Sequence, residues 1–142
     1  MSQEEKVFGR QDFLDMPKPE VVKFFSPALK AHVYLREMSA LEYESYSNSL
    51  VEFKTDAKGN PTYEHRPEGM RLKYLVRMLC DAKGNRLFKD NEYELLGAQL
   101  VGKDSQNALR EIYQEAMRIN GGTDEELEKN LSAEEEKDSS FG

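Results

Sequence analysis

Residues 29–42 read LKAHVYLREMSALE, an alternating segment that leads directly into a helix start. Apolar and polar side chains alternate strictly from Leu29 to Arg36, and this pattern predicts a β-strand with one face on a core. A β-branched and aromatic run, Val21–Phe25, precedes it across the turn signal Ser26-Pro27. The two segments predict an antiparallel hairpin. Its second strand should turn one set of side chains inward, namely Leu29, Ala31, Val33 and Leu35, and the other set outward, namely Lys30, His32, Tyr34 and Arg36.

A capping box follows this strand. Ser39 can accept a hydrogen bond from the backbone N–H of Glu42, and the Glu42 carboxylate can accept one from the N–H of Ser39. We expect the helix that begins here to continue to about Thr55, because apolar residues recur mainly at spacings of three and four. They are Leu41, Tyr43, Tyr46, Leu50, Val51 and Phe53.

Turn and helix signals alternate in the next part of the chain. Residues 56–61 (DAKGNP) predict a turn, and residues 62–68 predict a polar linker. A second helix is expected from Gly69 to about Cys80, with its apolar stripe at helical spacing formed by Met70, Tyr74, Leu75, Met78 and Leu79. The pentapeptide DAKGN then recurs at residues 81–85 and predicts a second turn.

Two further helices are expected. Asp90 can cap a short one over Asn91–Leu96, which Gly97 weakens or ends. Asp104 or Ser105 can cap the last one, whose stripe is the clearest in the chain: Leu109, Ile112, Tyr113, Ala116 and Met117. This helix should end at Asn120-Gly121-Gly122.

These elements predict an α+β fold that is mainly helical, in which an N-terminal antiparallel β-hairpin precedes three or four helices. Residues 1–19 predict a flexible arm, residues 20–122 a single folded domain, and residues 123–142 a disordered acidic tail. The tail carries eight acidic and two basic side chains, so its net charge is -6 of the total of -7. Residues 1–122, with 18 basic and 19 acidic side chains, are close to neutral at -1.

The charge pattern excludes several partner classes. Lys and Arg are not clustered, which argues against nucleic acid and against a basic membrane-binding patch. No apolar run reaches the roughly 20 residues that cross a bilayer, and the segment Met1–Lys6 lacks the features of a secretory signal. We therefore expect a cytosolic protein, and the single cysteine, Cys80, fits a reducing compartment.

Catalytic and metal-binding patterns are not found in the sequence. His32 and His65 do not form a zinc-binding spacing, and Cys80 ends an apolar stripe, which favours burial over nucleophilic chemistry. In the loop that starts at Asp81, Lys83 would occupy the third ligand position of a calcium site, so this loop is interpreted as a turn. We expect no enzymatic activity and no cofactor.

Three segments carry a resemblance to a known family. His32–Glu44 resembles the strand-to-helix opening of tail assembly chaperones of long-tailed bacteriophages, in which a V-x-[VL]-R-E-[ML]-[ST] run enters a charged helix. Tyr74–Asp90, followed by Glu94–Gly97, resembles the family's central signature, which contains C-D-x-x-G-x-x-L-F. Ile112–Gly121 is similar to its last helix and stop. The insert at residues 56–68 is longer and more polar than in the family pattern, and residues 19–25 match weakly.

The resemblance implies a non-enzymatic role in the host cytoplasm. Such a chaperone binds the tape measure protein, keeps it soluble, helps recruit tail tube subunits and leaves before the virion is complete. Many members also exist as a frameshift-extended form that adds a tube-binding domain, and here the two forms would diverge in the acidic tail.

The candidate partner-binding residues are apolar side chains on two of the predicted helices, which could contact a client or a second copy of the chain: Tyr43, Tyr46, Leu50, Leu109, Ile112, Tyr113 and Met117. An alternative function from a different class stays open. In that interpretation the chain is a small acidic adaptor or inhibitor whose tail binds a basic partner.

Overall fold

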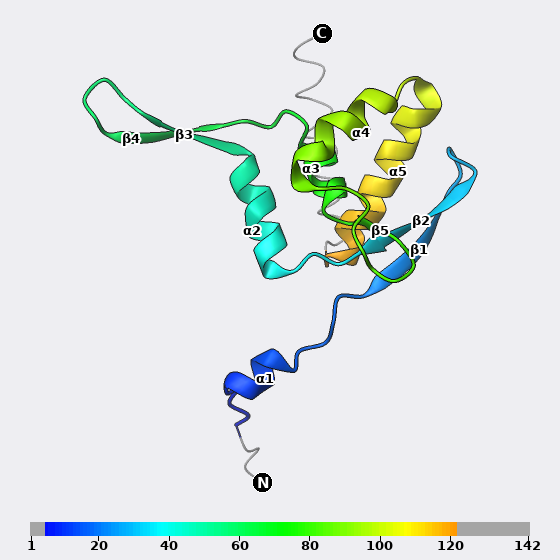
Figure 1. Ribbon diagram of the computed structural model, residues 1–142, viewed down its shortest axis with the longest axis horizontal. Coiled ribbons are helices and arrows are strands. Elements are labelled where there is room, and N and C mark those ends of the chain that lie inside the picture. Colours follow the sequence, from blue (N-terminus) through cyan, green and yellow to red (C-terminus); the bar gives the residue numbers. More distant parts are fainter. Residues whose placement is uncertain (1–4, 122–142) are drawn as a thin grey trace.

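The structure is a computed structural model that describes residues 5–121 (Figure 1). Its helices and strands are, in chain order, α1 (Arg10–Leu14), β1 (Val21–Ser26), β2 (Ala31–Arg36), α2 (Ala40–Ser49), β3 (Val51–Thr55), β4 (Pro61–His65), α3 (Met70–Val76), β5 (Leu79–Cys80), the 3-10 helix η1 (Asp90–Glu92), α4 (Tyr93–Gln99) and α5 (Lys103–Ile119). The predicted α+β class is confirmed, with five α-helices among the described residues where three or four were expected.

The predicted N-terminal hairpin is present as β1 and β2, which pair antiparallel with Val22 opposite Leu35. Leu35 is fully buried and Val33 half-buried, as the alternation predicts. The inward assignment of Leu29 and Ala31 is wrong, since both are exposed. Leu29 belongs to the turn, which includes Lys30 at φ 55°, and Ala31 is the first residue of the strand.

A third strand joins this sheet on the far side of β2. β5 pairs antiparallel with β2, with Leu35 opposite Leu79. The helix predicted from Gly69 to Cys80 therefore ends early: α3 stops at Val76, and Leu79 and Cys80 are extended. The physical reason is the sheet edge, because β2 offers backbone groups to this segment, and Arg36 N–H donates to the carbonyl of Met78 at 2.9 Å.

The helix that starts at the capping box ends at Ser49, six residues before the predicted end at Thr55. The box itself is confirmed: Ser39 Oγ accepts from Glu42 N–H at 3.1 Å, and the Glu42 carboxylate accepts from Ser39 N–H at 3.0 Å. Residues 51–55 were predicted as helix, Pro61 as the end of a turn and residues 62–65 as part of a linker. They instead form a second antiparallel hairpin, β3–β4. Each strand alternates apolar and polar side chains, and this period of two prevails over the helical spacing.

The turn between β3 and β4 is closed by Asp56. Its carboxylate accepts hydrogen bonds from the backbone N–H groups of Lys58 and Asn60, at 2.9 and 2.8 Å. Gly59 supplies the positive φ, +81°, that the turn requires. The recurring pentapeptide DAKGN thus forms hydrogen-bonded turns in both places, with Asp81 accepting in the same way from Lys83 and Asn85.

The last two helices differ from expectation mainly at their starts. Asp90 begins η1 and is not the cap of α4, and Gly97 lies inside α4. A Cβ at Gly97 would come within 2.6 Å of Leu72 Cδ1, so glycine allows α4 to lie closely against α3. α5 begins at Lys103, which places Asp104 in its first turn, and its predicted end at Asn120-Gly121 is confirmed.

The core lies between α2, α3, α5 and the inner face of the three-stranded sheet. Its buried members are Leu35, Tyr46, Leu50, Tyr74, Leu75, Met78, Leu79, Ala108, Ile112, Tyr113 and Ala116. The segment from Lys73 to Cys80 is buried at all eight positions. We call the part formed by β1, β2, β5 and α2–α5 the body. The acidic tail predicted for residues 123–142 lies outside the described residues.

Asn120 joins three parts of the body at the end of α5. Its Oδ1 accepts from the N–H of Met38 at 3.0 Å, and its Nδ2 donates to the hydroxyl of Tyr74 at 2.6 Å and contacts Met78 Sδ at 3.1 Å. Burial raises the pKa of Tyr74 to about 12, and the hydrogen bond from Asn120 opposes part of that shift. The asparagine thus fastens α5 to α3 and to the segment between β2 and α2.

Replacing this side chain tests its structural role. We expect Asn120→Ala to lower the free energy of unfolding by about 1–3 kcal/mol, because buried polar partners lose their hydrogen bonds. Urea unfolding followed by circular dichroism measures this loss. The control is Asn91→Ala, at an exposed asparagine in η1, for which a change below about 0.5 kcal/mol is expected. Equal losses for both variants would contradict the assignment.

Candidate partner-binding surface

Four of the seven residues predicted to bind partners lie in the core: Tyr46, Leu50, Ile112 and Tyr113. The rings of Tyr46 and Tyr113 pack edge-on against Tyr74, with centroid distances of 5.0 and 5.4 Å. This aromatic packing fills the space between α2, α3 and α5. In the described fold these four side chains hold the body together and are inaccessible to a partner.

The other three predicted residues keep access to solvent. Tyr43 on α2 is 50% exposed, and Leu109 and Met117 on α5 are half-buried at the rim of the core. Leu109 and Met117 pack against the core, and the ring of Tyr43 lies 6.0 Å from that of Tyr46. The stripes found in the sequence are therefore mainly the inner faces of α2 and α5.

The β3–β4 hairpin exposes apolar side chains, and Figure 1 shows it extending away from the body. Every residue from 52 to 65 is exposed. Phe53 and Tyr63 lie directly opposite each other in the register, with 72% and 77% of their surfaces exposed and ring centroids 6.3 Å apart. By strand alternation they share one face of the hairpin with Val51, Thr55, Pro61 and His65. We call this the aromatic face.

The opposite face of the hairpin is charged. Lys54 Nζ lies 3.3 Å from Glu64, and Arg66 pairs with both Glu52 and Glu64. The hydrogen bond from Lys54, together with the charges of Arg66 and Lys54, lowers the pKa of Glu64. Glu52 and Glu64 lie opposite each other in the register, and the positive charges of Lys54 and Arg66 offset the repulsion between the two carboxylates. The hairpin is therefore amphipathic: one face carries charged side chains, and the other is the mainly apolar aromatic face.

The body fixes where the hairpin leaves it. The Lys73 ammonium, on a residue that is only 8% exposed, donates to the carbonyl of Ser49 at the end of α2, at 2.9 Å, and lies 5.0 Å from the centre of the Tyr93 ring. A cation at this position also stabilises the negative end of the helix dipole. Because β3 begins two residues after Ser49, this contact fixes the base of the hairpin.

Arg77 contacts α2 at Ser45, one helical turn before Ser49. Its guanidinium donates to Ser45 Oγ at 3.1 Å and to the carbonyl of Lys73 at 2.7 Å, and lies 3.6 Å from Asp90. Burial lowers the pKa of Arg77, and the charge of Asp90 opposes that effect. Lys73 and Arg77, one helical turn apart, together tether α2 to the second half of α3 and its C-cap.

A second exposed apolar group lies on the segment before β1. It contains α1, all of whose residues are exposed, and extends away from the body in Figure 1. Its apolar side chains are all between 42% and 81% exposed: Val7, Phe8, Phe13, Leu14 and Met16. The rings of Phe8 and Phe13 meet edge-on at 5.4 Å. This N-terminal arm could also contribute apolar contacts to a partner.

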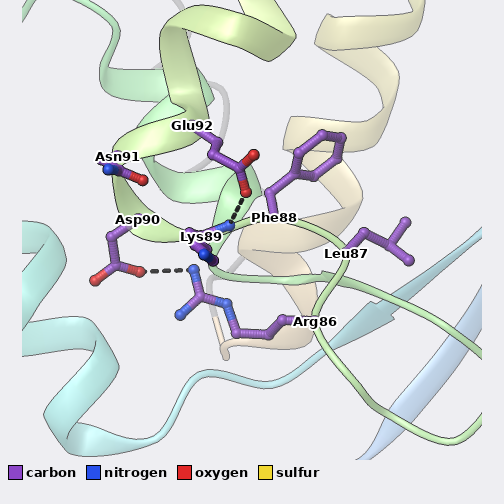
Figure 2. A pocket seen from close by; sticks show the side chains of 7 residues that line it. All are labelled: Arg86, Leu87, Phe88, Lys89, Asp90, Asn91 and Glu92. Atoms are coloured by element: carbon purple, nitrogen blue, oxygen red, sulfur yellow. Dashed lines mark hydrogen bonds and ion pairs between the residues drawn. The ribbon is translucent and has the colours of Figure 1, made fainter.

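The hollow lined by residues 86–92 has a volume of about 620 Å³ and is formed by one continuous segment, the loop before η1 and η1 itself (Figure 2). Arg86 pairs with Asp90 at 2.6 Å, and the Glu92 carboxylate accepts from the N–H of Lys89 at 2.7 Å. The side chains of Arg86, Asp90 and Glu92 thus stabilise the conformation of this segment before α4. This arrangement resembles a helix entry more than a ligand site.

Among residues 5–121, no group of three or more His, Cys, Asp and Glu is placed to hold a metal ion. His32 and His65 are both exposed, and Cys80 is buried, where desolvation raises the pKa of its thiol. No helix within the described part of the chain is long and apolar enough to cross a membrane.

The sequence-based prediction missed the hairpin, although a signal for it exists. Apolar and polar side chains alternate in both VEFKT (residues 51–55) and PTYEH (residues 61–65). These two runs directly precede and follow the turn pentapeptide DAKGN. Two alternating runs around a Gly-containing turn are typical of a β-hairpin.

Comparison with known proteins gives one similarity. No protein-family profile and no curated protein sequence matches the chain. The fold is similar to a solved structure described as "Structure of bacteriophage HK97 tail assembly chaperone", with a TM-score of 0.43 and 16% sequence identity. The match covers 77% of this chain and 95% of that one. At this level of similarity, the function of this chain has to be inferred from its own residues.

The division between core and exposed aromatic residues can be tested by truncation. We expect Tyr113→Ala to lower the free energy of unfolding by about 3–5 kcal/mol, because it empties a packed site. Phe53→Ala should change it by less than about 0.5 kcal/mol, because its ring is exposed. Thermal and urea unfolding of the two variants measures both effects. Comparable losses would contradict the placement of Phe53 outside the body.

Proposed function

We propose that this chain is a non-enzymatic phage tail assembly chaperone that binds the tape measure protein, keeps it soluble and helps recruit tail tube subunits. The observation that carries the proposal is the aromatic face of the β3–β4 hairpin, which exposes Phe53 and Tyr63 on an element that extends from a packed body. Exposed apolar side chains that gather on one surface are a mark of protein-binding sites.

The segments that resemble the family lie together in the body. The first contains most of β2 and the capped start of α2, the second contains the end of α3 and all of β5, and the third is the end of α5. β5 pairs with β2, and Asn120 bonds to Met38 and Tyr74, so each segment contacts the other two. The resemblance therefore rests on residues that make one packed unit, which supports a shared scaffold.

The segment that departs from the family pattern, residues 56–68, supplies the turn and second strand of the hairpin. A scaffold that keeps its packing residues while its extended element varies suits a protein that must fit one particular client. We propose that the hairpin gives this chain its client specificity.

The aromatic face has the dimensions of a helix-binding surface. Five residues of strand span roughly 16 Å, which matches about three turns of an α-helix. A tape measure protein presents long apolar helix faces, and the rings of Phe53 and Tyr63 could cover part of such a face. Several copies bound along one client would act multivalently, so each contact can be weak.

The remaining parts of the proposal concern the setting of this activity. The chaperone would act in the host cytoplasm and be absent from the mature virion. The excess negative charge, which lies mostly in residues 123–142, would keep the complex soluble. A frameshift-extended form, if the gene encodes one, would add the contact to the tail tube protein.

Co-expression with the cognate tape measure protein tests the proposal. We expect the chain to raise the soluble fraction of the tape measure protein, measured by centrifugation and quantitative gel analysis. The double variant Phe53→Ser, Tyr63→Ser should lose most of this effect while its own unfolding midpoint is unchanged. A tape measure protein that is equally soluble with and without the chain would refute the chaperone function.

Two controls sharpen this experiment. The double variant Leu95→Ser, Val101→Ser removes exposed apolar side chains from the body and should keep full activity. A chain that lacks residues 123–142 should also keep most of the binding. If that truncation abolished binding while the hairpin variant retained it, the acidic adaptor function would be favoured.

A further inference from the structure

The β3–β4 sheet has two open edges, because it contains only these two strands in the described part of the chain. The backbone groups that point outward follow from the hydrogen-bond pattern. Arg66 N–H donates to the carbonyl of Leu50, and Asp56 N–H donates to that of Asn60. In an antiparallel pair, hydrogen-bonded positions alternate with positions that turn their N–H and C=O away. Val51, Phe53 and Thr55 therefore present their backbone groups at the outer edge of β3.

The two edges are not equivalent. The same alternation puts Pro61, Tyr63 and His65 at the outer edge of β4. Proline has no N–H, so this edge lacks a donor at the end nearest the turn. The β3 edge has a full set of donors and acceptors, and it is the one suited to extending the sheet.

We infer that β3 pairs antiparallel with β3 of a second copy of this chain, about a two-fold axis at Phe53, to give a four-stranded sheet. In this register Phe53 faces the partner's Phe53, and Val51 faces the partner's Thr55. These are the positions with outward backbone groups, and they form a regular ladder of about six hydrogen bonds between the chains. In this register every outward N–H and C=O group of Val51, Phe53 and Thr55 has a hydrogen-bonding partner in the other copy.

The side chains are complementary in the same register. Glu52 stands opposite the partner's Lys54, and the symmetry repeats this contact in the other direction. Both pairs lie on the charged face, next to the ion pairs that Arg66 makes with Glu52 and that Lys54 makes with Glu64. Cross-strand pairs of opposite charge stabilise antiparallel sheets, whereas like charges in the same place oppose them.

The apolar face gains from the pairing as well. The two Phe53 rings become neighbours, and the two Tyr63 rings flank them, so the aromatic faces of both copies join into one surface. An isolated two-stranded hairpin is marginally stable in water, and two more strands relieve this weakness. The pairing does not depend on the proposed function, because it follows from the strand alone.

A contact this small lies at the low end of protein interfaces, so we expect a reversible dimer whose population rises with concentration. Sedimentation velocity of the full chain from micromolar to millimolar concentration measures it. Lys54→Glu places like charges in both symmetric pairs and should weaken the dimer about tenfold or more. Lys58→Glu makes the same charge change in the exposed turn and should leave the dimer unchanged.

A mixing experiment tests the register directly. Glu52→Lys alone brings two positive charges together in each symmetric pair, so this variant should also be weakened. An equimolar mixture of Glu52→Lys and Lys54→Glu restores opposite charges across the two chains, and it should recover association as a mixed dimer. Recovery also shows that both hairpins are folded. A native chain that stays monomeric, a dimer insensitive to Lys54→Glu, or a mixture that fails to associate would each overturn the inference.

Discussion

Lys73 and Arg77 bring two positive charges into the most deeply buried segment of the chain, and α2 provides oxygen partners for both of them. Burying a cation is costly unless hydrogen-bonding groups replace the water it loses. Ser45 and the carbonyl of Ser49 meet this need only when α2 lies along α3. The position of α2 is therefore constrained by charge as well as by the packing of Tyr46 against Tyr74.

This constraint determines the shape of the rest of the chain. With the end of α2 tied to Lys73, β3 starts at the edge of the body and its hairpin extends outward. The core takes up the inner faces of α2, α3 and α5. Among residues 5–121, the most exposed aromatic rings are those of Phe53 and Tyr63 on the hairpin and of Phe13 on the N-terminal arm. In the proposed function, packing of the body and contact with a client thus fall mainly to different parts of the sequence.

Local signals in the sequence predicted much of the body. The β1–β2 hairpin, the Ser39–Glu42 capping box, the Asp81 turn, the burial of Cys80 and the end of α5 all depend on neighbouring residues, and all are confirmed. The end of α2 was not predictable in this way. Val51 and Phe53 fit a helical stripe and a strand equally well, and the strand that decides between them lies at residues 61–65. β5 was not predicted for the same reason, because its partner strand β2 lies more than forty residues earlier in the chain.

Sequence patterns also could not predict which apolar side chains on a helix are exposed to solvent and which are buried. Tyr43 and Tyr46 are one helical turn apart on α2, yet one is half-exposed and the other is buried against Tyr74. Only the arrangement of the helices separates them, and that arrangement depends on contacts such as those of Arg77 and Asn120, which join residues more than thirty positions apart.

The central claim is that the body serves as a rigid base and the hairpin makes the contact with the client. Amide hydrogen exchange, measured on the chain with and without its tape measure protein at equal chain concentration, tests it most directly. The account predicts slower exchange in β3 and β4 on binding, while amides in β1, β2 and β5 exchange at unchanged rates. Slower exchange confined to the body, with the hairpin unaffected, would contradict it.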